Sequence, residues 1–89
     1  MSRLDRALRN DVQALTMLRD ELVLHAHLLN SEARTHWQQL EQDWERLRGQ
    51  LRRAEQAGEQ ASEEARTAAK LLLEALQQGY VQIRGALQV

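Results

Sequence analysis

The feature that most constrains this chain is an apolar stripe of helical spacing that runs almost end to end without a proline. From Leu4 to Leu87, apolar and small residues recur at alternating steps of three and four, which keeps them on one side of an α-helix. Ala, Leu, Gln, Glu and Arg, all good helix formers, make up most of the sequence. We therefore predict an all-α protein, with residues 1–89 forming a single helical coiled-coil domain.

Three serines divide the chain into nearly equal lengths, and each is followed by a charged or acidic first turn. Serine is a preferred N-cap because its hydroxyl accepts a hydrogen bond from a free backbone N–H at the start of a helix. Ser2, Ser31 and Ser62 are therefore candidate helix starts. Gly58 can adopt the left-handed conformation that ends a helix, so we expect a break at 57–61.

Two architectures satisfy these signals. The preferred one has a long first helix (about 3–56) and a second helix (about 62–88) that form an antiparallel helical hairpin, which dimerises. It is preferred because no glycine or proline lies between Ser2 and Arg48, and the stripe keeps an eleven-residue period through Asn30–Ser31. The alternative is a monomeric three-helix bundle with breaks at 30–31 and 57–61, in which Asn30 ends the first helix and Ser31 caps the next.

Size complementarity between the two stripes selects a register for the hairpin. Large side chains of the first helix meet small ones of the second, as where Leu51 faces Ala65, and Trp37 faces Gly79 and Tyr80. Tyr80 is expected to keep its hydroxyl near solvent. The predicted hairpin core consists of Trp37, Leu40, Trp44, Leu47, Leu51, Ala65, Leu72, Leu76 and Ile83.

The first third of the chain carries an apolar face that this hairpin leaves uncovered. An uncovered face of that size marks an interface or an aggregation hazard. We expect it to form a seam between segments or between molecules, to support a homodimer, and to be able to dock a helical protein partner. The predicted interface residues are Leu15, Leu18, Leu22, Ala26 and Leu29.

The charge pattern and the absence of chemical motifs argue against enzymes and nucleic-acid binders. A net charge of -1 gives no field to attract a polyanion, so no nucleic-acid partner is expected. The chain has no cysteine, and His25, His27 and His36 are not spaced to share a metal ion on one helix. Carboxylates alternate with arginines at helical spacings, without a catalytic motif. We predict no enzyme activity, no catalytic or metal-binding residues and no cofactor.

The location of the protein is predicted from what its N-terminus and its apolar segments lack. The first residues alternate in charge and do not resemble a secretory signal. The longest apolar segments are far shorter than the roughly 20 residues that a membrane span needs. We therefore expect a cytoplasmic protein.

Several segments resemble a loose group of small bacterial coiled-coil proteins. Members of that group have a long Ala-rich helix, a short break and a second helix with an aromatic residue; some are linked to stress responses and some are labelled apolipoprotein-like. The resemblance covers about residues 15–85 and implies a bacterial interaction protein without catalytic residues. It is carried by Glu32-Ala33-Arg34, Trp37, Leu40 and Trp44, then by residues 68–73 and 80–83.

We thus predict a non-enzymatic helical protein that self-associates and docks a helical protein partner. The resemblance to stress-linked proteins implies a role in the stress response. The alternative is an amphipathic protein that lays the apolar face of residues 15–29 on a lipid or membrane surface. The slightly negative net charge and the single lysine weaken adsorption to an anionic bilayer.

Overall fold

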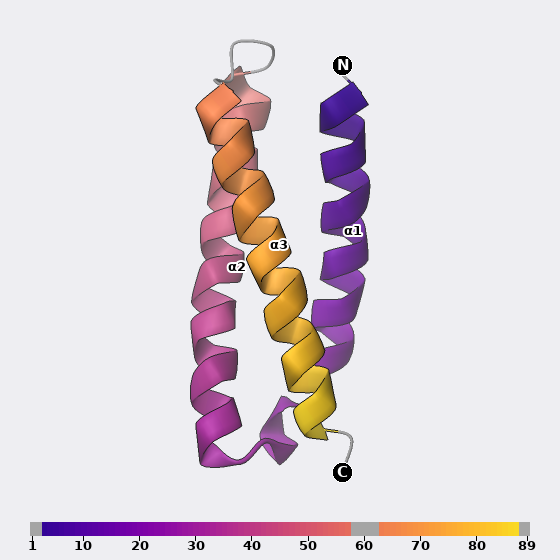
Figure 1. Cartoon of the computed structure of the whole chain (residues 1–89), viewed down its shortest axis with the longest axis vertical. Helices are drawn as coiled ribbons and strands as arrows, with labels where there is room; N and C mark the ends of the chain where they lie inside the picture. The colour runs from indigo at the N-terminus through magenta and orange to yellow at the C-terminus, as the bar shows by residue number, and fades with distance from the viewer. Residues whose placement is uncertain (1–2, 58–62, 88–89) are drawn as a thin grey trace.

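The computed structural model describes residues 3–57 and 63–87, and these ranges are almost entirely helical. Helix α1 spans Arg3–Val23, a short 3₁₀ turn spans Ala26–Leu28, α2 spans Ser31–Ala57 and α3 spans Glu63–Leu87. The helices α1 and α3 run in the same direction and α2 runs in the opposite one (Figure 1). The all-α prediction is confirmed, and the arrangement fits the predicted alternative of a three-helix bundle.

Helix α3 is the helix that packs against both of the others. It packs along α2 and also against α1, whereas α1 and α2 have few contacts with each other. Figure 1 shows α3 crossing in front of the space between the other two helices. The core therefore centres on α3, where its apolar side chains meet those of both neighbours. The buried apolar residues are Leu15, Leu22, Leu29, Trp37, Leu40, Trp44, Leu47, Ala69, Leu73, Leu76, Tyr80 and Ile83.

The predicted long first helix, 3–56, is wrong for this chain. Helix α1 ends at Val23 and α2 begins at Ser31. Asn30, rather than Ser31, is the N-cap of α2, because its Oδ1 accepts a hydrogen bond of 2.8 Å from the Ala33 N–H. The bend folds α1 back onto α3, which buries stripe residues that a straight single chain would leave in water.

The second predicted break, at 57–61, lies outside the described residues except for Ala57. Helix α2 ends at Ala57 and α3 begins at Glu63. The capping roles predicted for Ser2 and Ser62, and the helix-ending role of Gly58, lie outside the described residues.

Most of the predicted hairpin core lies inside the bundle. Leu51 and Leu72 are partly buried and pack against the core. Ala65 is exposed, so its predicted core position is wrong. It lies on the same side of α3 as Ala69 but one turn nearer the start of the helix, before the first buried residue. The members that are buried are Trp37, Leu40, Trp44, Leu47, Leu76 and Ile83.

The predicted register places Trp37 opposite Gly79 and Tyr80; the contact of Trp37 with Tyr80 is present, whereas the neighbour of Gly79 is Leu40. The Trp37 and Tyr80 rings lie with their centroids 5.8 Å apart. A Cβ added to Gly79 would lie 3.1 Å from Cδ1 of Leu40 and closer still to its Cδ2, so the absence of a side chain at Gly79 lets Leu40 in. The expectation that the Tyr80 hydroxyl reaches solvent is wrong, because the residue is 0% exposed.

The predicted interface residues of α1 and the corner after it are used within the chain. Leu15, Leu22 and Leu29 are buried, and Leu18 and Ala26 are partly buried against the same core. They form a seam between segments of one molecule, which is one of the two roles predicted for them.

Candidate interaction groove

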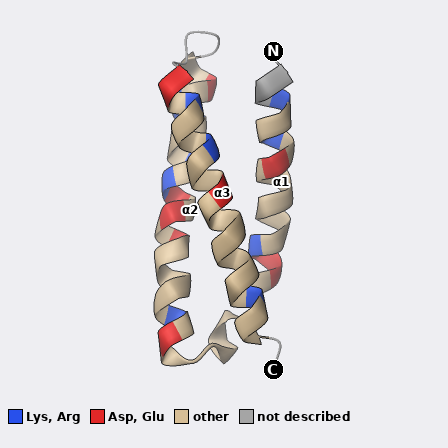
Figure 2. Cartoon of the chain, in the orientation of Figure 1, with Lys and Arg blue, Asp and Glu red and all other residues tan. Residues whose placement is uncertain are grey.

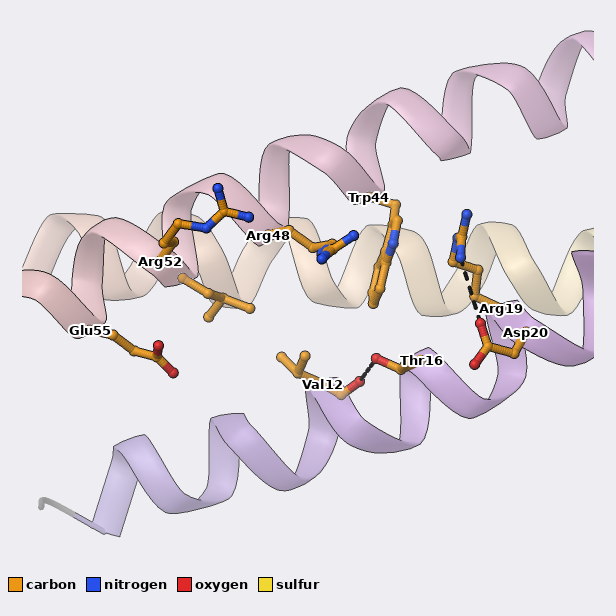
Figure 3. A pocket seen from close by; sticks show the side chains of 9 residues that line it. Val12, Thr16, Arg19, Asp20, Trp44, Arg48, Arg52 and Glu55 are labelled. Carbon is orange, nitrogen blue, oxygen red and sulfur yellow. Dashed lines mark hydrogen bonds and ion pairs between the residues drawn. The ribbon is translucent and has the colours of Figure 1, made fainter.

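A groove of about 510 Å³ lies between α1 and α2, where these two helices stay apart. Val12 and Thr16 of α1 form one side, and Trp44 and Leu51 of α2 form the other. Figure 3 shows α3 passing behind these side chains, while the residues that line the groove come from α1 and α2. Its apolar floor therefore consists of Val12, the indole of Trp44 and Leu51.

Charged side chains form the rim of the groove. Arg48, Arg52 and Glu55 project from α2, and Asp20 comes from α1 (Figure 3). The Arg48 guanidinium lies 3.7 Å from the Glu45 carboxylate, but its side chain remains 51% exposed. An apolar centre with a charged, wet rim is the usual anatomy of a protein interface.

Arg19 closes the groove at one end and links α1 to α2. Its Nε and Nη2 donate hydrogen bonds of 2.8 and 2.6 Å to the two carboxylate oxygens of Glu41. Its guanidinium carbon lies 5.6 Å from the centre of the Trp44 ring, within the range of a cation–π contact. The hydrogen bond to Glu41 raises the pKa of Arg19, although partial burial opposes this. Arg19 is thus permanently charged and holds α1 at a fixed place on α2.

Tyr80 lies in the core near this ion pair. Its hydroxyl oxygen is buried and has no hydrogen-bond partner among the described residues. Burial raises the pKa of the Tyr80 phenol well above its ordinary value, and the negative charge of Glu41 raises it further. The phenol therefore stays neutral over the physiological range and acts as a large packing group rather than an acid.

A second candidate surface is the apolar corner after α1. Large apolar side chains there are strongly exposed, with Leu24 at 70% and Leu28 at 66%. Val23 and Met17 add to the exposed apolar area of this part of the chain. Elsewhere, Lys and Arg alternate with Asp and Glu along all three helices, so no helix has a single sign of charge (Figure 2).

Sequence reasoning found the floor of the groove only in part. Trp44 and Leu51 were predicted as core residues, and both line the groove as well. Arg19 and Glu41 were missed, because they lie on different helices and meet only after the chain bends. A signal existed at Arg19, which follows Leu18 at the edge of the stripe, where a charge needs a partner.

The described residues form neither a grouped set of metal ligands nor a membrane-spanning helix. Within 3–57 and 63–87, no three His, Cys, Asp or Glu side chains are grouped as metal ligands would be. His25 and His27 are exposed at the corner. None of the described helices combines the length and the apolar character needed to cross a bilayer.

Comparison of the chain with models of protein families, with curated proteins and with solved structures finds no match. The function is therefore inferred from the geometry of the groove and of the surfaces around it.

Proposed function

We propose that the protein is a non-enzymatic helical interaction protein, and that it holds a helix of a protein partner in the groove between α1 and α2. The observation that carries this proposal is the groove itself, with an apolar floor and a charged rim. Three helices occupy three corners of a four-helix bundle, and the open space between α1 and α2 is the fourth corner.

The dimensions suit a helix. Trp44 and Glu55 lie about three turns apart on α2, which corresponds to about 16 Å of helix length. An amphipathic helix presents apolar anchors at positions i, i+3 or i+4 and i+7, which span about 10 Å. The volume of about 510 Å³ lies within the range of roughly 300–1,000 Å³ that binding pockets occupy. The groove therefore has room for the apolar edge of one helix.

The rim favours a helix with carboxylates along one edge. Arg19 is already neutralised by Glu41, and Asp20 lies 3.6 Å from the same guanidinium. Arg48 and Arg52 of α2 line the open groove, where Glu55 is an acidic neighbour and Arg48 also pairs with Glu45. Trp and Arg side chains are the residues most often found at the energetic centre of interfaces. We expect the partner helix to place its acidic edge along α2.

Peptide binding tests this function. The probe is a synthetic amphipathic helix with leucines at i, i+4 and i+7 and glutamates along one edge, compared with the same peptide carrying lysines. In a Trp37→Phe background, the fluorescence of Trp44 reports occupation of the groove. We expect the acidic peptide to bind more tightly than the basic one.

Two matched variants locate the binding site. Leu51→Glu places a charge on the groove floor and should weaken binding by about tenfold or more. Leu71→Glu places the same charge on α3, at a residue that is 61% exposed and outside the groove lining, and should leave binding unchanged. Absence of binding, or equal effects of the two substitutions, would contradict the proposed function.

The exposed corner favours a second candidate function, contact with a lipid surface. Leu24 and Leu28, at 70% and 66% exposed, could enter the edge of a bilayer without opening the bundle. Vesicles of phosphatidylcholine should then bind the wild type and fail to bind the double variant Leu24→Ser/Leu28→Ser. Equal binding of both proteins, or none, removes this candidate.

A further inference from the structure

We propose that two copies of this chain exchange α1, so that α1 of each copy packs against α2 and α3 of the other. The occupant of the surface that α1 covers is thus a second copy of the same segment. The hinge is the corner of residues 24–30, between α1 and α2. This inference is independent of the helix-binding function, because it concerns how α1 is supplied and not what enters the groove.

The interface for this exchange already exists in the single chain. Leu15 and Leu22 are each 2% exposed against the rest of the bundle, so α1 fits its binding surface closely. Two polar contacts add specificity: the Arg19–Glu41 pair joins α1 to α2, and Arg84 of α3 lies 3.3 Å from Glu21 of α1. Every one of these contacts can form equally well with α1 of a second copy, since the two copies have the same sequence.

Helix α1 is the segment that can leave the bundle most easily. It packs mainly against α3, and its contacts with α2 are few. On the side of α1 that lines the groove, Val12 and Thr16 are only partly buried. In contrast, α2 and α3 are packed together along their length. Release of α1 therefore leaves an α2–α3 pair that can receive another α1.

The hinge can open without breaking any rule of backbone geometry. The corner contains no glycine or proline. Its departure from helical geometry includes Leu29, which has φ -71° and ψ 143°, and His25, which has φ -113° and ψ 1°. Its hydrogen bonds are all local: the N–H groups of His25, Leu28 and Leu29 donate to the carbonyls of Leu22, His25 and Ala26 at 3.0–3.2 Å, and Arg34 Nη2 donates to Leu29 O at 3.2 Å. A helical corner requires rotation at these residues, and both residue types accept helical φ and ψ.

The apolar stripe stays in phase through the corner. Leu22, Ala26, Leu29 and Ala33 follow one another at steps of four, three and four. A helical corner would therefore keep the apolar sides of α1 and α2 aligned on one long surface. A corner used only as a bend has no need of this phase. In an open chain, α1 and α2 form one long helix beside the antiparallel long helix of the second copy. The stripe must then stay in phase so that both α1 and α2 turn their apolar sides toward that copy.

Complementary charge reversals test the exchange directly. Arg19→Glu alone places a carboxylate against Glu41, and Glu41→Arg alone places a guanidinium against Arg19, so each variant should melt at a lower temperature than the wild type. The two variants are unfolded together in equal amounts, refolded and melted. In an exchanged dimer, position 19 of each copy meets position 41 of the other, so both contacts become attractive.

The melting temperatures distinguish an exchanged dimer from a monomer. We expect the mixture to melt above either single variant, between the wild type and the double variant Arg19→Glu/Glu41→Arg. The double variant also shows that the reversed pair is compatible with folding. A mixture that melts as the two separate variants do would overturn the exchange, because in a monomer each charge meets only its own chain.

A proline substitution in the hinge tests the exchange independently, through the mass of the protein in solution. Proline is tolerated at the first position of a helix, which Ser31 occupies in the bent chain, but not in the interior of a helix. Light scattering should therefore give twice 10.3 kDa for the wild type at high concentration and 10.3 kDa for Ser31→Pro. A wild type that stays at the monomer mass at every concentration, or a Ser31→Pro protein that remains dimeric, would also overturn the exchange.

Discussion

The contact between Gly79 and Leu40 allows a sharp test of how α2 and α3 fit together. Gly79 lies inside α3 and is buried against α2. A Cβ at this position would lie 3.1 Å from Cδ1 and 3.3 Å from Cγ of Leu40, and closer still to Cδ2. Leu40 is only 5% exposed, so it has little room to move away. Gly79→Ala should therefore force the two helices apart or push Leu40 out of its rotamer.

Two opposing effects set the size of the change. Replacing glycine by alanine inside a helix stabilises the protein by about 1 kcal/mol, because alanine loses less backbone entropy on folding. Overpacking of a filled core costs about 1–3 kcal/mol. At Gly79 the second effect should win, for a net loss of up to about 2 kcal/mol.

Two other glycines provide matched controls. Gly49 of α2 would place a Cβ 3.8 Å from the flexible end of Arg53, and Gly85 of α3 would place one in open space. Gly49→Ala and Gly85→Ala should each raise stability by up to about 1 kcal/mol, with the smaller gain at Gly85 because it lies near the end of α3.

Thermal unfolding followed by circular dichroism measures the difference. For a chain of this size, 1 kcal/mol shifts the melting temperature by about 4–8 °C, so Gly79→Ala and Gly49→Ala should move in opposite directions by several degrees. Adding Leu40→Ala to Gly79→Ala should cost less than Leu40→Ala alone does in the wild type, because the new methyl group fills part of the space. The reasoning fails if Gly79→Ala stabilises the protein as much as Gly49→Ala does.

Four further substitutions probe the core and the ion pairs. Tyr80→Phe removes a buried hydroxyl without a described partner and should stabilise the protein by about 1 kcal/mol in urea unfolding. Because the pKa of Tyr80 is raised in the folded state, the phenol's contribution to the free energy of unfolding is complete below the ordinary phenol pKa of about 10 and is lost as pH rises above it. Tyr80→Phe should lack this loss of stability at alkaline pH, and an identical loss in the variant would contradict the reasoning. Arg19→Gln should cost about 1 kcal/mol at low salt and less at high salt, whereas Arg48→Gln, at an exposed pair, should change stability by less than about 0.5 kcal/mol; equal effects would refute a clamp at Arg19. Trp44→Ala should cost about 3–5 kcal/mol because the side chain is 4% exposed, and retained melting temperature would contradict its place in the core.

The part of the fold that sequence predicts well is the part fixed by neighbouring large and small side chains. The contact of Trp37 with Tyr80 follows from the alignment of the two stripes, and the ring centroids lie 5.8 Å apart. The prediction of a break at 57–61 follows from a glycine near a serine, and α2 ends at Ala57. These features depend on local backbone preference or on one pair of helices, and the sequence states both directly.

The bend at 24–30 could not be predicted in the same way. Every residue of the corner accepts a helical conformation, so no local signal rules out a continuous helix. The bend is decided by burial of Leu15 and Leu22 on α3, which lies more than forty residues further along the chain. A single Asn30 cap of about 1 kcal/mol then fixes where α2 begins.

Errors in the predicted core have a related cause. The hairpin alignment gave α3 one neighbour, so it placed Leu72 on the contact line with α2. In the bundle α3 also faces α1, which moves the centre of its buried face toward Leu73, at 2% exposed, and leaves Leu72 partly buried. The core of a shared helix therefore cannot be derived from one of its two partners.

The groove and the hinge together make the two proposals separable. If α1 is exchanged, the same groove forms between α1 of one copy and α2 of the other, because Val12 and Leu51 keep the same neighbours. Helix binding should then be the same in the bent monomer and in the dimer. The Ser31→Pro variant, held in the bent form, should thus lose self-association and still bind the acidic peptide. Loss of peptide binding together with the dimer would show that the groove needs the open chain, which the contacts within a single chain do not require.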